Sequence, residues 1–260
     1  CLVCGSDLLE IDQDGESDSV GQVVEDWEIE ESIVQDSESE EHLVVRDKNT
    51  GRQALMILYS EIHEPDSSIY QAMKRMDKDH VPELILTGRW RKRPYEIYEK
   101  IDCGALRETA FTGPDDIERL KVIILEVAKA LRDFGEVGLR HRNITPDTLF
   151  FRETEPLDLV ITNFGSARLS DFDLDIVSPL TLTRYSAPET IVGAVSSASD
   201  WWSLGMIALE QVTSGECFRD VNEKAFLIHV VTRGIELPES LSPQVRNLLE
   251  GLLVKDPSER

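Results

Sequence analysis

The chain has 260 residues, and its 50 Asp and Glu residues against 27 Lys and Arg residues give a formal net charge of -23. Nucleic acid and anionic membrane surfaces repel a protein of this charge, so neither is expected as a partner. No apolar run reaches about 18 residues and no signal peptide is visible, and four cysteines without an evident pairing suit a reducing compartment; we therefore predict a cytoplasmic protein.

Residues 1–24 combine a cysteine pair with an acidic stretch. Cys1 and Cys4 form a C-x-x-C-G knuckle, which supplies two of the four ligands of a zinc ribbon. No second knuckle follows, so we expect no metal within this chain unless a ribbon is completed upstream. Between Asp7 and Glu41 there are fifteen Asp and Glu residues and no Lys or Arg. We therefore predict a disordered acidic linker or an incomplete zinc ribbon before residue 25.

Residues 25–99 are rich in predicted strands. Residues 42–47 and 53–59 have the composition of paired strands around a turn at 48–51, and residues 84–90 and 95–99 continue the sheet around a turn at 91–94. A helix is predicted near residues 67–79.

The rest of the chain is predicted to be mostly helical. Pro114 begins a helix with an apolar stripe, and further helices are predicted at 201–212, 221–233 and 243–253, the first of them apolar on all sides. Short strands are expected at 149–151 and 159–161. The residues of the stripe are Ile117, Leu120, Ile124, Val127, Leu131 and Phe134.

Four motifs follow one another in this second part. They are His141-Arg142-Asn143, Asn163-Phe164-Gly165, Ala187-Pro188-Glu189 and Asp200-Trp201-Trp202-Ser203-Leu204-Gly205. Their order and spacing resemble the C-lobe of the eukaryotic-type (Ser/Thr) protein kinase family, with its HRD, DFG, APE and D-x-W-S-x-G motifs. The resemblance implies an α+β, two-lobed protein-kinase-like fold, with a small β-rich N-lobe at 25–99 and a larger helical C-lobe at 104–260.

The residues to which the resemblance assigns chemistry are replaced. Asn143 stands at the catalytic Asp, Thr145 at the following Lys, Thr148 at the metal-binding Asn, Asn163 at the DFG Asp and Met56 at the Lys of the third strand. The stretch that should form the glycine-rich loop, residues 32–41, contains no glycine. The sequence therefore predicts a pseudokinase with a degenerate active site that is not an enzyme and for which ATP and Mg²⁺ are not expected.

Other motif residues are retained, and the resemblance gives them structural roles. They are His141, Arg142, Glu189, Asp200 and Arg260. Asp200 is expected to accept hydrogen bonds from the catalytic-loop backbone. Arg260 is expected to pair with Glu189.

The predicted function is regulation or protein interaction in signalling, with another protein or another domain of the same polypeptide as the partner. A knuckle followed by a kinase-like domain resembles large bacterial signalling proteins that carry an effector such as a phosphatase. Two alternatives stay open: an enzyme with non-kinase transferase chemistry on this fold, and a nucleotide-binding module without catalysis. The sequence does not decide whether Ser178, Thr181 or Thr183 is phosphorylated.

Overall fold

The computed structural model describes residues 19–33, 40–76, 78–108, 114–170, 174–176, 182–219 and 222–260. The predicted knuckle at Cys1 and Cys4, most of the acidic linker, residues 34–39 of the expected glycine-rich loop, and the candidate phosphorylation sites Ser178 and Thr181 lie outside these residues. The chain divides into two compact units, Cys1–Glu64 with Leu84–Lys100, and Pro65–Glu83 with Ile101–Arg260.

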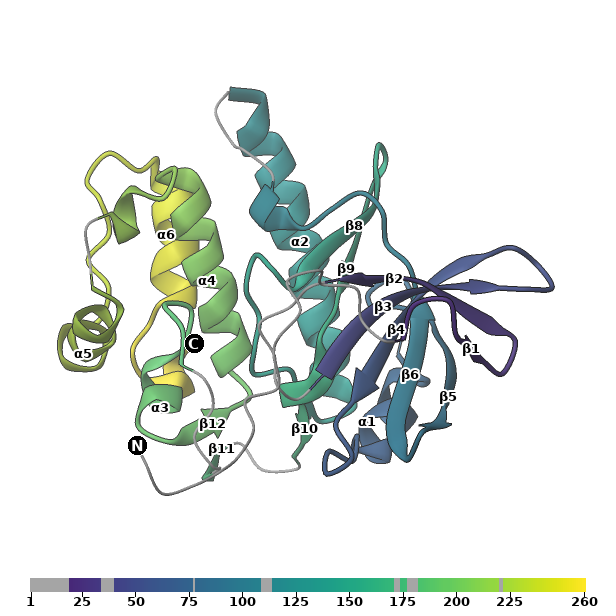
Figure 1. The fold of residues 1–260 in the computed structure, drawn as a ribbon. Coiled ribbons are helices and arrows are strands. Elements are labelled where there is room, and N and C mark those ends of the chain that lie inside the picture. Colours follow the sequence, from purple (N-terminus) through teal and green to yellow (C-terminus); the bar gives the residue numbers. More distant parts are fainter. Residues whose placement is uncertain are drawn as a thin grey trace, which may run out of the picture. The chain divides into compact units, whose positions relative to one another are not determined.

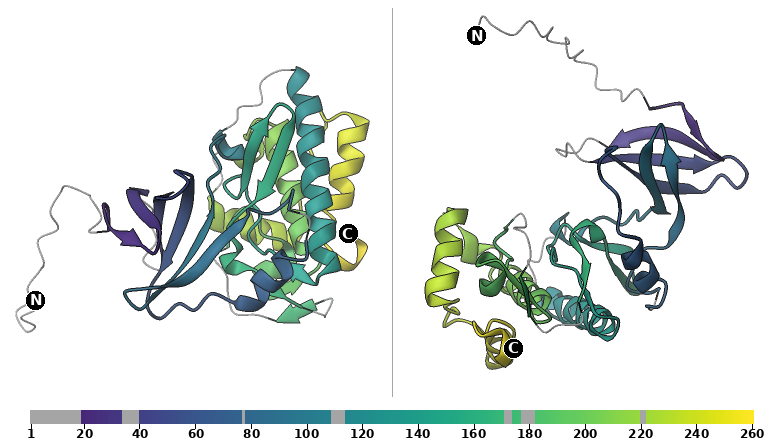
Figure 2. Two further views of the ribbon diagram at one scale, coloured as in Figure 1. Left: turned by 90° about the vertical axis from the view of Figure 1, so that its right-hand side faces the viewer. Right: turned by 90° about the horizontal axis from the view of Figure 1, so that it is seen from below.

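The first unit is a six-stranded antiparallel sheet with the strand order β1-β2-β3-β4-β6-β5 (Figure 1). The sheet is strongly bent (Figure 2). The predicted strands are confirmed, and the turn between β5 and β6 is shorter than predicted, because only Arg91 and Lys92 separate the two strands. The strands are β1 (Val23–Val24), β2 (Trp27–Ile33), β3 (Glu40–Asp47), β4 (Gln53–Tyr59), β5 (Leu84–Trp90) and β6 (Arg93–Glu99).

Side chains that alternate along these strands form the core of the first unit. On β4, Ala54, Met56 and Leu58 are fully buried, while Leu55 and Ile57 between them are half-buried on the opposite face. This alternation follows from the two-residue period of a strand. The core also contains Val24, Trp27, Ile29, Leu43, Val45, Tyr95 and Ile97.

The second unit contains the helices and three small two-stranded sheets. The helices are α1 (Ser67–Met73), α2 (Pro114–Glu136), α3 (Pro188–Ile191), α4 (Ser199–Val212), α5 (Glu223–Arg233) and α6 (Pro243–Leu252). The sheets pair β7 (Leu139–Arg140) with β10 (Arg168–Leu169), β8 (Leu149–Thr154) with β9 (Leu157–Ile161), and β11 (Leu174–Ile176) with β12 (Ala194–Ser196). The described residues of this unit also form the 3₁₀ turns η1 (Leu106–Glu108), η2 (Phe164–Ser166), η3 (Glu216–Phe218) and η4 (Pro257–Glu259).

Helix α2 buries Leu120, Val127, Leu131 and Phe134 of the predicted apolar stripe, but two other residues of the stripe lie differently. Ile117, placed on the predicted apolar stripe, is half exposed, whereas Ile123 is buried. Ile124 is only partly buried. The predicted stripe is therefore wrong at its beginning, because the residues that face α4 and β9 are Leu120, Ile123, Val127, Ala130, Leu131 and Phe134.

Helix α4 is buried along most of its length, as its apolar sequence predicts. Residues 202–209 are all buried, and Trp202 is the largest fully buried side chain. Helices α2 and α6 both pack against α4, and α4 and α6 run side by side (Figure 1). Within the described residues, no helix combines the length and apolarity needed to cross a bilayer.

The close packing of α4 and α6 depends on a glycine, and this gives a test. A Cβ atom at Gly205 would lie 2.8 Å from Leu252 Cβ and 2.8 Å from Leu253 Cδ2. We expect Gly205→Ala to lower the free energy of unfolding of the second unit by about 1–3 kcal/mol, because overpacking forces the helices apart. Urea unfolding followed by circular dichroism measures the change.

Gly251 on α6 is the matched control, because an added Cβ there meets no atom within 4 Å. Gly251→Ala should be neutral or should stabilise by about 0.5–1 kcal/mol, because alanine is the better helix former. Equal effects of the two substitutions would contradict the packing described here.

Candidate functional site

The segment between β7 and β8 holds the residues that the sequence assigns to the catalytic loop, and His141 is at its buried start. The His141 Nε2–H donates to the Thr162 carbonyl (2.9 Å), and Nδ1 accepts from the Asn143 N–H (3.3 Å). These two bonds require the neutral ring with its proton on Nε2. Burial lowers the pKa of His141, which also favours the neutral form. Phe134 and Phe164 pack against the ring.

Asp200 holds the backbone of the same segment. Its two carboxylate oxygens accept hydrogen bonds from the His141 N–H and the Arg142 N–H, each at 2.8 Å. The predicted role of Asp200 as an acceptor for the loop backbone is therefore present. Arg142 has a φ of 69°, a left-handed conformation that is costly for arginine and that these hydrogen bonds sustain. Its side chain donates to the Ser166 carbonyl (3.3 Å).

Thr148 and Thr145 are both buried and close the loop on itself. The Thr148 hydroxyl accepts from the Thr145 N–H (3.0 Å) and lies 3.1 Å from the Asn143 carbonyl and 3.0 Å from the Thr145 carbonyl, to which it donates. The Thr162 N–H donates to the Thr148 carbonyl (2.8 Å). Thr148 stands at the position that the resemblance gives to a metal-binding Asn, and its hydroxyl is hydrogen-bonded to the loop backbone.

Asn143 and Asn163 present neutral amides in this region. Asn143 is half-buried, while Asn163 is exposed and has a φ of 64°, a conformation that asparagine tolerates better than most residues. An amide carries no charge, so neither side chain supplies the negative charge that a base or a divalent cation needs at those positions.

The carboxylates near the loop have partners of their own. Asp147 pairs with Arg107 (3.0 Å), Asp158 pairs with Arg152 (3.5 Å), and Asp200 accepts the two backbone N–H groups. Over the part of the chain that is described, no group of three or more His, Cys, Asp or Glu side chains could hold a metal ion.

Met56 lies in the core of the first unit rather than at a surface. Its side chain is fully buried among residues such as Leu43 and Ile97. Met56 stands at the position that the resemblance gives to the Lys of the third strand, and its uncharged thioether cannot bind phosphate as a Lys does. This assignment of Met56 stays a prediction.

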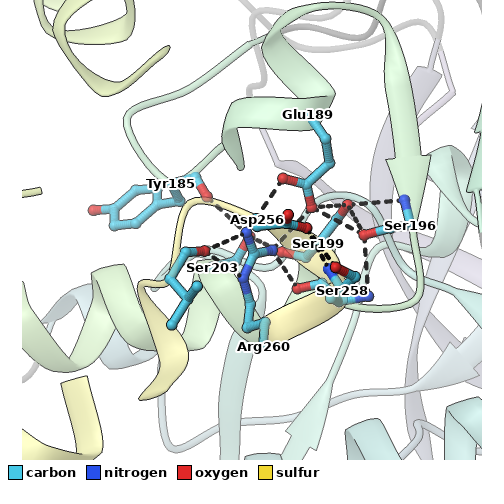
Figure 3. A network of polar contacts seen from close by, with 10 residues as sticks. Tyr185, Glu189, Ser196, Ser199, Ser203, Asp256, Ser258 and Arg260 are labelled. Atoms are coloured by element: carbon cyan, nitrogen blue, oxygen red, sulfur yellow. Dashed lines mark hydrogen bonds and ion pairs between the residues drawn. The ribbon is translucent and has the colours of Figure 1, made fainter. Parts of the chain in front are cut away.

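The ion pair predicted between Glu189 and Arg260 is present and forms the centre of a buried network (Figure 3). Arg260 donates to both carboxylate oxygens of Glu189, at 2.9 and 3.3 Å, and its other N–H groups reach the carbonyls of Ala198 and Val254. Ser199 donates to the same carboxylate at 2.9 Å. The side chain of Arg260 has no exposed surface, and its guanidinium carbon lies 5.0 Å from the Trp202 ring centroid.

A second network, which the sequence did not predict, holds Tyr185 beside the catalytic loop. The Tyr185 hydroxyl donates to Glu210 (2.7 Å) and accepts from Arg107 (2.9 Å), and Arg107 also binds Asp147 and Glu210. Burial raises the pKa of Tyr185, so its hydroxyl stays protonated. Tyr185 and Asn143 also line one small pocket, together with Arg142, Thr183, Ser186 and Asp200.

The buried ion pair predicts a large loss of stability in one variant. We expect Arg260→Met to lower the free energy of unfolding of the second unit by about 3–5 kcal/mol, because Glu189 is left buried and unpaired. Arg219 is the control, since it pairs at the surface with Glu216 at 3.5 Å. Arg219→Met should change stability by less than about 0.5 kcal/mol in the same urea titration. Similar losses in the two variants would show that the buried pair has no special weight.

The hydroxyl of Thr148 predicts a smaller but specific effect. Thr148→Val keeps the shape of the side chain and leaves the buried Thr145 N–H without its acceptor, so we expect a loss of about 1–3 kcal/mol. Thr148→Ser keeps the hydroxyl and should retain most of the stability. Unfolding free energies of the three proteins provide the measurement, and a valine variant as stable as the serine variant would contradict the assignment.

Comparison with known proteins places the chain in a family of enzymes. Residues 57–260, well over half of the chain, match the family described as "Protein kinase domain". The chain is 27% identical over 240 residues to the "Serine/threonine-protein kinase AtPK1/AtPK6" of Arabidopsis thaliana, covering 82% of this chain and 50% of the relative. It is 24% identical over 239 residues to the "RAC family serine/threonine-protein kinase homolog" of Dictyostelium discoideum, covering 83% and 51%.

A third similarity is to the human "Ribosomal protein S6 kinase alpha-3", with 29% identity over 157 residues, 59% of this chain and 20% of the relative. The chain therefore spans about half or less of the length of these curated relatives.

These relatives contradict the prediction that the chain is not an enzyme. All three are named as kinases, and the family match at residues 57–260 includes Asn143, Thr145, Thr148 and Asn163, four of the positions at which the prediction found chemical groups missing. The prediction rested on side-chain types at single motif positions. Such positions show which groups are absent there, and they do not measure phosphoryl transfer. With its α+β fold of a small β-rich N-lobe and a larger helical C-lobe, this chain belongs to the protein kinase domain family.

Proposed function

We propose that this chain acts in cytoplasmic signalling as a regulatory or protein-interaction domain of the protein kinase family. Its partner is another protein or another domain of the same polypeptide, and an attached effector such as a phosphatase is the class that the sequence favours.

The observation that carries this proposal is the use of the catalytic-loop polar groups for structure. The Thr148 hydroxyl is bound to the backbone of Asn143 and Thr145, and both ring nitrogens of His141 are bound to backbone groups. Asp147, the carboxylate within the loop, is paired with Arg107. A loop held in this way is a rigid support for the surfaces around it.

An acidic surface on the first unit offers the binding face. Glu25, Asp26, Glu28 and Glu31 are all exposed on β2 and on the turn that precedes it. Exposed carboxylates of this density attract a basic segment and repel phosphate. The partner that fits is therefore a protein with an exposed run of Lys or Arg.

Two acidic residues nearby, Glu40 and Glu41, are less suited to partner binding because they have partners within the sheet. Glu40 interacts with His42 at 3.2 Å, and Glu41 forms an ion pair with Arg93. Charge reversal at these positions would break contacts within the sheet, so Asp26 and Glu31 are the better positions to test.

Protein kinase activity is the second candidate function, and the family match and the names of the relatives favour it. It predicts transfer of phosphate from ATP to a Ser or Thr residue of a protein substrate. The two candidates differ in what they require of Asn143 and Asn163, because a binding role leaves these side chains unused.

The interaction role predicts that the double variant Asp26→Lys/Glu31→Lys binds its partner about tenfold more weakly, which corresponds to about 1.4 kcal/mol. Pull-down from a cell extract with quantitative mass spectrometry identifies the partner, and titration of the purified partner gives the affinity. Raising the salt concentration should weaken the wild-type complex in the same direction, because screening shortens the range of charge attraction.

The matched control is Glu153→Lys/Glu239→Lys, which makes the same charge change at two exposed positions of the second unit. It should bind as the wild type does, and so should Asn143→Ala/Asn163→Ala. The same proteins are assayed for transfer of labelled phosphate from ATP. Transfer that the asparagine variant abolishes, together with unchanged partner affinity in the lysine variants, would reject the interaction role in favour of the kinase role.

A further inference from the structure

The tip of the β5–β6 hairpin is strongly basic in an otherwise acidic chain. Arg89, Arg91, Lys92 and Arg93 surround Trp90, so four of the 27 Lys and Arg residues lie within five positions. Neither the family motifs nor the proposed function gives this cluster a role.

The turn at the tip has a backbone that its residues do not favour. Arg91 has a φ of 50° and Lys92 a φ of 69°, both in the left-handed region. Two consecutive residues of this kind form the type I′ turn of a two-residue hairpin, which ordinarily contains Asn-Gly. Residues with long side chains in this conformation are strained, and strained residues are concentrated at functional positions.

The tip is held in one arrangement by its own contacts. Arg89 donates to the Lys92 carbonyl (2.8 Å) and pairs with Glu64. The Arg91 guanidinium carbon lies 4.5 Å from the Trp90 ring centroid, and Trp90 packs against the core of the sheet. Because the Arg89 and Arg91 side chains already have partners, binding of a ligand here costs less side-chain conformational entropy than binding at a flexible loop.

Two of the four cations lack a carboxylate partner in the described part of the chain. Arg89 pairs with Glu64, and Arg93 pairs with Glu41. Arg91 donates instead to the neutral amide oxygen of Gln22 (2.7 Å), and for Lys92 the described residues provide no ion pair. Among the described residues, the tip therefore presents two positive charges without a carboxylate partner next to an indole ring.

We propose that this hairpin tip, Arg89–Arg93, binds the acidic segment of residues 7–18 of the same chain. The segment has six carboxylates and no Lys or Arg. It lies outside the described residues and precedes Ser19 in the chain. Its carboxylates are Asp7, Glu10, Asp12, Asp14, Glu16 and Asp18.

The point of attachment favours this segment over a separate peptide. Gln22, which binds Arg91, follows Asp18 by only four residues, so the segment joins the sheet beside the tip. Twelve residues can span about 40 Å when extended, which gives the carboxylates ample reach. A tether this short also gives an effective concentration in the millimolar range, against which a free acidic peptide has to compete.

The contact has a consequence that rests on the proposed function. A basic partner that extends from the acidic face of Glu25, Asp26, Glu28 and Glu31 to the carboxylates of residues 7–18 has to displace the hairpin, so the tip lowers the affinity of the acidic segment for such a partner.

Zero-length carboxyl-to-amine cross-linking of the 260-residue chain tests the proposal. We expect mass spectrometry to find Lys92 linked to carboxylates of residues 7–18 at least about fivefold more often than Lys48, and the difference to vanish in 1 M salt, where the Debye length is about 3 Å. Lys48 is a fair control, because it is exposed on the β3–β4 turn of the same unit. Equal linking of the two lysines would overturn the proposal.

Two further arms keep the result specific. Arg91→Glu retains the Lys92 amine and should reduce its links to the segment, whereas Arg132→Glu makes the same charge change on α2 and should not. A mixture of heavy and light isotope-labelled chains separates contacts within one chain from contacts between copies. Unchanged linking in Arg91→Glu, or links mainly between heavy and light chains, would reject binding within the same chain.

Discussion

The first residues of α4 bind three separate segments of the second unit, and the arrangement of the catalytic loop depends on them. The Ala198 carbonyl accepts from Arg260, the Ser199 hydroxyl donates to Glu189, and the Asp200 carboxylate accepts the His141 and Arg142 backbone N–H groups. All three lie at the end of a helix that is buried along most of its length. A shift of this helix end would therefore disturb the loop, α3 and the chain terminus together.

Much of this arrangement could be predicted from the sequence, because the motifs are local and their partners are fixed by the fold. The Glu189–Arg260 pair and the role of Asp200 are examples. The faces of individual elements were harder to predict: Ile117 and Ile123 are both apolar, and only packing against α4 decides which is buried.

The Tyr185 network escaped prediction for a different reason. Arg107 and Glu210 are separated by 103 residues, and neither belongs to a sequence motif that would connect them. Their contact arises only in the folded unit, where the Tyr185 hydroxyl also binds both side chains. The family membership, by contrast, follows from the order of the motifs. The expectation that the chain is not an enzyme was wrong, because it was drawn from side-chain types at motif positions, and these do not measure activity.

The contacts that hold the catalytic loop in its conformation do not depend on the side chain of Asn143. Asp200 accepts hydrogen bonds from the backbone N–H groups of His141 and Arg142, and the Thr148 hydroxyl is hydrogen-bonded to two further backbone groups. The side chain of Asn143 takes part in none of these contacts. The residue at that position can therefore change without loosening the loop. This explains how a chain can retain the framework of the family while presenting neutral amides at Asn143 and Asn163.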